Sequence, residues 1–98
     1  MLLIWPGQPE GLAWGFTHER WAGSVLVREE HRVVCWNLHA RQEGRGFFRD
    51  LKQAIERDGL YVAVPCPMPI MVSILLHYGF VRHDEPLGDG MVDVWEIL

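Results

Sequence analysis

A chain of 98 residues is expected to form one domain, here residues 1–98. Its hydrophobic content of 49% and its five tryptophans predict a packed core, with aromatic surface that a ligand or partner chain can cover. The net charge of −4, with no basic stripe, argues against nucleic acid as a partner.

The composition also argues against a membrane or secreted location. No apolar run has the length of a membrane span, and the first eleven residues lack the basic start of a secretory signal. Cys35 and Cys66 lie in apolar, strand-like runs, which indicates buried free thiols in a reducing, cytoplasmic compartment. The five histidines show no paired metal-ligand spacing, so no metal site is expected.

The first four predicted elements are strands. They cover residues 2–5, 12–16, 24–29 and 32–39, with short links between them. Strands joined by short links predict an antiparallel meander.

The hydrophobic period changes in the second half of the chain. Apolar residues recur at helical spacing after Gly46, and Gly59 is placed to end this helix. Residues 60–64 read as a buried strand, and a second helix over 70–78 follows Pro69. Residues 80–85 and 91–98 form the last predicted hairpin, across the turn at 86–90. This order predicts an α+β fold: a mixed, mostly antiparallel sheet of about six to seven strands with two main helices.

The stretch RQEGRG, residues 41–46, joins the fourth strand to the first long helix. The first turn of a helix carries N–H groups without partners, and the helix dipole favours negative charge there. Gly44 and Gly46 would let phosphate oxygens approach the backbone, and Arg41 and Arg45 would add charge-assisted bonds. These ingredients suit a pyrophosphate. The alternative interpretation is a glycine turn that binds nothing.

These residues, in this order of elements, resemble the GNAT superfamily of N-acetyltransferases. The family signature Arg/Gln-x-x-Gly-x-Gly/Ala stands here as Arg41, Gly44 and Gly46, and the second helix closes on Gly79 and Phe80 as in the family. The resemblance covers roughly residues 12–97. It implies a three-layer α/β/α arrangement from which the two helices that usually precede the second strand are missing.

The resemblance implies an acetyl-CoA site. Its pantetheine arm would lie where two strands part, its pyrophosphate would lie on the glycine loop, and its thioester would face an attacking amine of a small molecule or protein. The implied cofactor-binding residues run from the end of the fourth strand through the loop: Leu38, His39, Ala40, Arg41, Gln42, Glu43, Gly44, Arg45, Gly46 and Phe47.

Four side chains are candidates for proton transfer: Glu30, His31, His39 and Tyr78. Glu30 stands where histone-type members place a glutamate base, and the two histidines are of a residue type suited to acid–base work. Tyr78 is a candidate donor to the leaving thiolate, although the family position for that tyrosine is Leu75 here. The alternative for Glu30 and His31 is a solvated turn.

Two functions stay open at this stage. One is an acetyl-CoA-dependent N-acetyltransferase. The other is a GNAT-like binding or structural protein without turnover, because the asparagine usual after the fifth strand is replaced by a proline-rich stretch at 65–69. The closing stretch is similar to the tails of compact phage proteins, which implies a virion or host-interaction role. Without covering helices, Trp14 and Trp21 would favour a homodimer or a protein partner.

Overall fold

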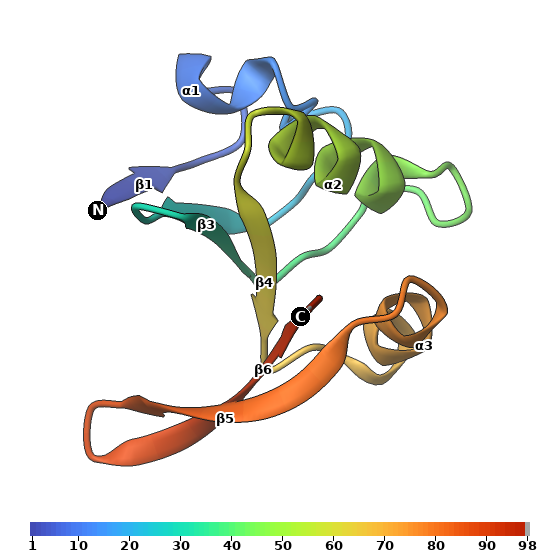
Figure 1. Cartoon of the computed structure of the whole chain (residues 1–98). Coiled ribbons are helices and arrows are strands. Elements are labelled where there is room, and N and C mark those ends of the chain that lie inside the picture. Colours follow the sequence, from blue (N-terminus) through green and yellow to red (C-terminus); the bar gives the residue numbers. More distant parts are fainter. Residues whose placement is uncertain (98) are drawn as a thin grey trace.

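The computed structural model describes residues 1–97, so Leu98, the last residue of the predicted final strand, lies outside the described residues. Nine elements follow one another along the chain (Figure 1): β1 Leu2–Ile4, α1 Pro9–Leu12, β2 Val25–Arg28, β3 Arg32–Trp36, α2 Phe47–Arg57, β4 Tyr61–Pro65, α3 Pro69–His77, β5 Val81–Leu87 and β6 Gly90–Glu96. None of the described helices has both the length and the apolar character that a membrane crossing requires.

The six strands form one sheet in the order β1-β2-β3-β4-β6-β5. The first three strands make an antiparallel meander, and β4, β6 and β5 are also antiparallel to one another. The pair β3–β4 is parallel and joins these two halves. The prediction of an α+β fold with a mixed, mostly antiparallel sheet is therefore confirmed.

The predicted strand at residues 12–16 is wrong. The short helix α1 ends there and is followed by turns, and the Phe16 N–H donates to the Gly11 carbonyl over 3.0 Å. A Cβ on Gly11 would lie 3.0 Å from Ile4 Cγ2 and 3.1 Å from Phe16 Cβ, so the glycine allows a compact turn that buries Phe16. The alternation of apolar residues arises from this turn rather than from a strand.

The helices pack on one face of the sheet. The larger core cluster joins strand residues such as Val33 and Val62 to Leu51 and Ile55 of α2 and Leu75 of α3. The second cluster lies on the opposite face and contains strand residues only: Val27, Val34, Trp36, Ala63, Val92 and Val94. The described residues thus form two layers and not the three expected, because α1 has four residues and packs through Gly11 against the larger cluster. We call the second surface the helix-free face.

Candidate ligand groove

The parallel strands β3 and β4 part at their C-terminal ends. They pair in register through three residue pairs, the last of which is Val34 with Ala63. Just beyond each strand stands a residue other than glycine with a positive φ, Asn37 at 53° and Cys66 at 46°. A left-handed residue turns an extended chain out of its path, so the strands separate at this point.

From Asn37 and Cys66 onward, the chain after β3 bonds to residues 20–24 on one side, and the chain after β4 bonds to β6 on the other. Beyond Asn37, the chain bonds to residues 20–24: Ala22 N–H donates to the His39 carbonyl over 3.0 Å. On the other side, Cys66 N–H donates to the Asp93 carbonyl of β6 over 2.9 Å. The prolines 65 and 67 beside Cys66 have no N–H group with which to bond to β3.

Ser24 holds the bend at Asn37. Its side chain is fully buried, and its Oγ donates to the Asn37 carbonyl over 2.8 Å. The same Oγ accepts the His39 N–H over 3.1 Å. The hydroxyl therefore supplies the two hydrogen bonds that the regular ladder loses at the bend.

The parted strands open into a groove made of two adjoining cavities. The first, of about 320 Å³, lies between residues 37–39 and residues 64–68. The second, of about 550 Å³, lies between residues 42–49 and α3. Four residues line both cavities: Leu38, His39, Met68 and Met71.

The backbone at the edge of the groove has free hydrogen-bonding groups. Because the His39 carbonyl and the Arg41 N–H face residues 20–22, the groups of the alternate residues Leu38 and Ala40 face the other way, toward the gap. The N–H and C=O groups of Leu38 and Ala40 make no hydrogen bond within residues 1–97. They are available to a ligand with amide groups.

The glycine loop leaves further N–H groups free at the start of α2. Gly44 and Gly46 have φ of 72° and 74°, and Gly46 is the N-cap of α2 with no side-chain cap. The first helical bond runs from Asp50 N–H to the Gly46 carbonyl, so the N–H groups of residues 47–49 have no partner among the described residues. A Cβ on Gly46 would meet Arg49 Nη2 at 2.6 Å, so the guanidinium lies directly beside the loop.

Most of the predicted cofactor-binding residues line the groove. They are Leu38, His39, Ala40, Gln42, Glu43, Gly44, Arg45, Gly46 and Phe47. Arg41 does not line it, because its Nε donates to the His18 carbonyl. Arg49, which is not among the residues predicted from the sequence, does line it. Its position three residues after Gly46, in the first turn of α2, could have indicated from the sequence that Arg49 lies at the loop.

The four candidates for proton transfer fall into two groups. His39 and Tyr78 line the groove, together with Ser73 and His77 of α3. Glu30 and His31 lie in the turn before β3, with side chains 88% and 79% exposed. That turn is at the opposite end of β3, about 20 Å from Asn37 at about 3.3 Å per residue. Glu30 and His31 therefore do not belong to the groove, and they form the solvated turn given as the alternative.

Trp14 and Trp21 differ from expectation. Trp14 and Trp21 are 3% and 1% exposed, so they belong to the core and offer no surface to a second chain. Trp14 Nε1 donates to Asp58 Oδ2 over 2.7 Å. Trp21 lines the larger cavity, and its Nε1 is buried without a partner among residues 1–97. Trp36 and Trp95 are partly buried and pack against the second and the larger core cluster, respectively.

The cysteines also differ from expectation. Both are free, but only Cys35 is buried, whereas Cys66 is exposed at the end of β4. Burial raises the pKa of the Cys35 thiol to about 12. Cys66 lies in the left-handed region directly after β4, so it does not continue the buried alternation of that strand, although the apolar run in the sequence suggested that it would.

A second group of titratable side chains lies on the helix-free face, where Arg32 of β3 reaches across β4. Its Nη1 donates to Glu96 Oε1 over 2.6 Å and to Glu85 Oε2 over 2.8 Å, and its Nη2 donates to Glu85 Oε1 over 2.8 Å. Its Nε donates to Glu29 Oε1 over 2.7 Å. The Arg32 hydrogen bonds lower the pKa of the Glu85 carboxyl to about 2, and those carboxylates raise the pKa of Arg32. Glu85 and Arg32 therefore stay charged over the physiological range.

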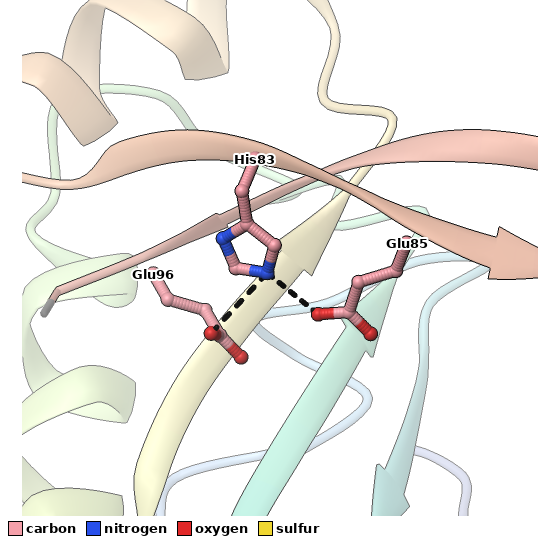
Figure 2. A group of neighbouring side chains, drawn as sticks. All are labelled: His83, Glu85 and Glu96. Carbon is pink, nitrogen blue, oxygen red and sulfur yellow. Dashed lines mark hydrogen bonds and ion pairs between the residues drawn. The ribbon is translucent and has the colours of Figure 1, made fainter.

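His83 completes this group (Figure 2). Its Nε2 lies 2.7 Å from Glu85 Oε2 and 3.6 Å from Glu96 Oε2. Sequence reasoning missed these residues, because it considered pairs of histidines only. The signal was the H-x-E spacing of His83 and Glu85 in a strand, which puts both side chains on one face.

Comparison with protein-family models, curated proteins and solved structures finds no match for this chain.

Proposed function

We propose that the chain is a compact member of the GNAT superfamily that binds acetyl-CoA and transfers its acetyl group to an amine of a small molecule or a protein. The observation that carries the proposal is the parting of β3 and β4 at the same end of the sheet as the glycine loop. A ligand with a long, narrow arm and an anionic pyrophosphate matches a gap between strands that leads to a loop of free N–H groups.

The gap suits the arm of the ligand. The free backbone groups of Leu38 and Ala40 can pair with the two amides of pantetheine as a strand would. Met68 and Met71 supply apolar, adaptable contacts on the opposite wall. One wall of the gap thus offers backbone hydrogen bonds and the other offers apolar contacts, which together favour an extended ligand of this kind.

The loop suits the anionic end. The free N–H groups of residues 47–49 carry the positive end of the α2 dipole. Arg45 and Arg49 line the same cavity and add positive charge. These features support a pyrophosphate in the space beside Gly44 and Gly46.

The groove also contains side chains that can move protons. Acyl transfer to an amine forms a C–N bond and breaks the C–S bond, so a proton leaves the amine and another reaches the thiolate. His39 suits the first role, because it lies where the strands part. His77 or Tyr78 suits the second, because both line the wall formed by α3.

Binding of acetyl-CoA is tested by calorimetric titration of the chain and two matched variants. Gly44→Glu and Gly88→Glu both introduce a carboxylate at a positive φ where no atom lies within 4 Å of the new Cβ. Only Gly44 lines the groove, because Gly88 lies in the β5–β6 turn. We expect micromolar binding by the wild type and by Gly88→Glu, and binding at least about tenfold weaker, or about 1.4 kcal/mol, for Gly44→Glu. No binding by the wild type, or equal binding by both variants, contradicts the proposal.

A second candidate function is binding without turnover, as in a virion or host-interaction protein. The observation that favours it is that Leu75, fully buried, stands at the family position of the tyrosine acid, while Glu30 is far from the groove. Release of free CoA thiol in the presence of amine acceptors distinguishes the two. Binding with turnover that falls in His39→Ala supports the enzyme, and binding with no turnover supports the second candidate.

A further inference from the structure

We propose that the helix-free face binds a divalent cation of the Zn²⁺ type through His83, Glu85 and Glu96. The inference is independent of the groove and of the function proposed for it. Figure 2 shows the three side chains converging from β5 and β6, with the imidazole directed at both carboxylates. One ring nitrogen and one oxygen from each carboxylate lie within 4.8 Å of one another.

The distances suit a tetrahedral cation. Zn²⁺ binds nitrogen and oxygen at about 2.0–2.2 Å, so two ligand atoms of one tetrahedron lie about 3.3–3.6 Å apart. His83 Nε2 lies 3.6 Å from Glu96 Oε2 and 2.7 Å from Glu85 Oε2. A small rotation of the Glu85 side chain that moves Oε2 by about 1 Å or less would lengthen its distance to His83 Nε2 into the tetrahedral range. All three side chains are partly exposed, so a water molecule could supply the fourth ligand.

The strand register fixes the three ligands relative to one another. His83 and Glu85 alternate along β5 and so share a face of the sheet. Glu96 lies opposite Val81, one diagonal step from His83. The cation would therefore join two strands that already hold its ligands within reach and would not need to order a loop.

The charge of the group matches a divalent cation. Three carboxylates, those of Glu29, Glu85 and Glu96, contact one guanidinium, that of Arg32. With His83 neutral, three negative charges and one positive charge leave a net charge of −2. A divalent cation would bring the group to neutrality, which the arginine alone does not do.

Arg32 orients the carboxylates and leaves oxygens for the cation. On Glu96 it contacts Oε1, and Oε2 faces His83. On Glu85 it contacts both oxygens, but Oε2 has a second lone pair, which already accepts from His83. An outer partner of this kind fixes the direction of ligand carboxylates in metal sites.

The cation would replace the proton between His83 and Glu85. A carboxylate only accepts, so the 2.7 Å contact is a bond donated by His83 Nε2–H. Nδ1 of the same ring makes no hydrogen bond within residues 1–97, so a neutral ring can carry its proton there and free the Nε2 lone pair. Metal binding then exchanges one hydrogen bond for two or three metal–ligand bonds.

The test is calorimetric titration of the full chain with ZnCl₂, alongside visible absorption with Co²⁺ as a spectroscopic probe. Two histidine variants are compared, each checked for its melting temperature. His83→Ala removes the proposed ligand, whereas His31→Ala removes an exposed histidine that lies 3.7 Å from the single carboxylate of Glu30. We expect one Zn²⁺ per chain in the wild type and in His31→Ala, and affinity at least about tenfold lower in His83→Ala.

Glu96→Gln provides a second variant that keeps the size of the side chain. It should lose affinity as His83→Ala does and should lose the Co²⁺ absorption typical of a four-coordinate site. Absence of Zn²⁺ binding by the wild type, or binding that is equal in His83→Ala and the wild type, would overturn the proposal and leave these residues as an ion-pair network.

Discussion

Replacing Ser24 with alanine tests whether one buried hydroxyl holds the strands apart. Ser24 is fully buried and makes two hydrogen bonds at the bend, to the Asn37 carbonyl and from the His39 N–H. Alanine is close to serine in volume, so the change removes these bonds and leaves almost no cavity.

The expected loss follows from the groups left behind. A buried hydrogen bond contributes about 1 kcal/mol net, and an unsatisfied buried N–H costs about 1–3 kcal/mol. Ser24→Ala removes two part-buried hydrogen bonds, those to the Asn37 carbonyl and from the His39 N–H, so we expect the free energy of unfolding to fall by about 1–2 kcal/mol. For a chain of this size, that is a large part of the total stability.

Urea denaturation measures this loss, with Ser73→Ala as the matched control. Ser73 is exposed on α3 and makes no side-chain hydrogen bond within residues 1–97, so its replacement should change the free energy of unfolding by less than about 0.5 kcal/mol. The slope with urea should be the same for all three proteins. A loss below about 0.5 kcal/mol in Ser24→Ala would refute the idea that this hydroxyl maintains the bend.

Three further outcomes follow from the structure. Gly46→Ala should lose about 1–2 kcal/mol of unfolding free energy, because its φ is 74° and the new Cβ displaces Arg49; a neutral change in thermal melting would contradict the left-handed cap. The free energy of unfolding should decrease as pH falls from about 4.5 toward 2, because the pKa of the Glu85 carboxyl is lowered to about 2 in the folded chain. This carboxylate should contribute about 1–2 kcal/mol after allowance for solvent screening. Acid titration of Glu85→Gln should therefore show a smaller decrease than the wild type. In a thiol assay on the native chain at mildly alkaline pH, Cys66 should react and Cys35 should not, because burial raises the pKa of Cys35 to about 12; two fast thiols would contradict this.

The long helices could be predicted closely because their signals are local. The apolar spacing after Gly46 and the stop at Gly59 match α2, and the start at Pro69 matches α3. The region of α1 could not be predicted in this way. Its alternating Trp14 and Phe16 satisfy the pattern of a strand, but a turn closed at Gly11 produces the same alternation.

The candidate sites depended more on contacts between distant residues. The glycine loop could be predicted from the local sequence alone. The hydrogen bond from Arg41 to the His18 carbonyl could not, because His18 lies far away along the chain. The bend at Asn37 rests on Ser24, thirteen residues away. The His83 site rests on hairpin register, which brings Glu96 to the same face. Neither partnership leaves a periodic signal in the sequence.

The position of Arg32 has a consequence for the whole sheet. Among residues 1–97, β3 and β4 join the two three-stranded halves of the sheet through three residue pairs, and Arg32 ties the closed end of that junction to Glu85 and Glu96 of the other half. Side-chain ion pairs therefore secure the two strands at the end opposite the opening at Asn37. Protection of the β3–β4 amides against hydrogen exchange reports how firmly that end is shut, and replacing Arg32 with glutamine should lower it while the helices keep theirs.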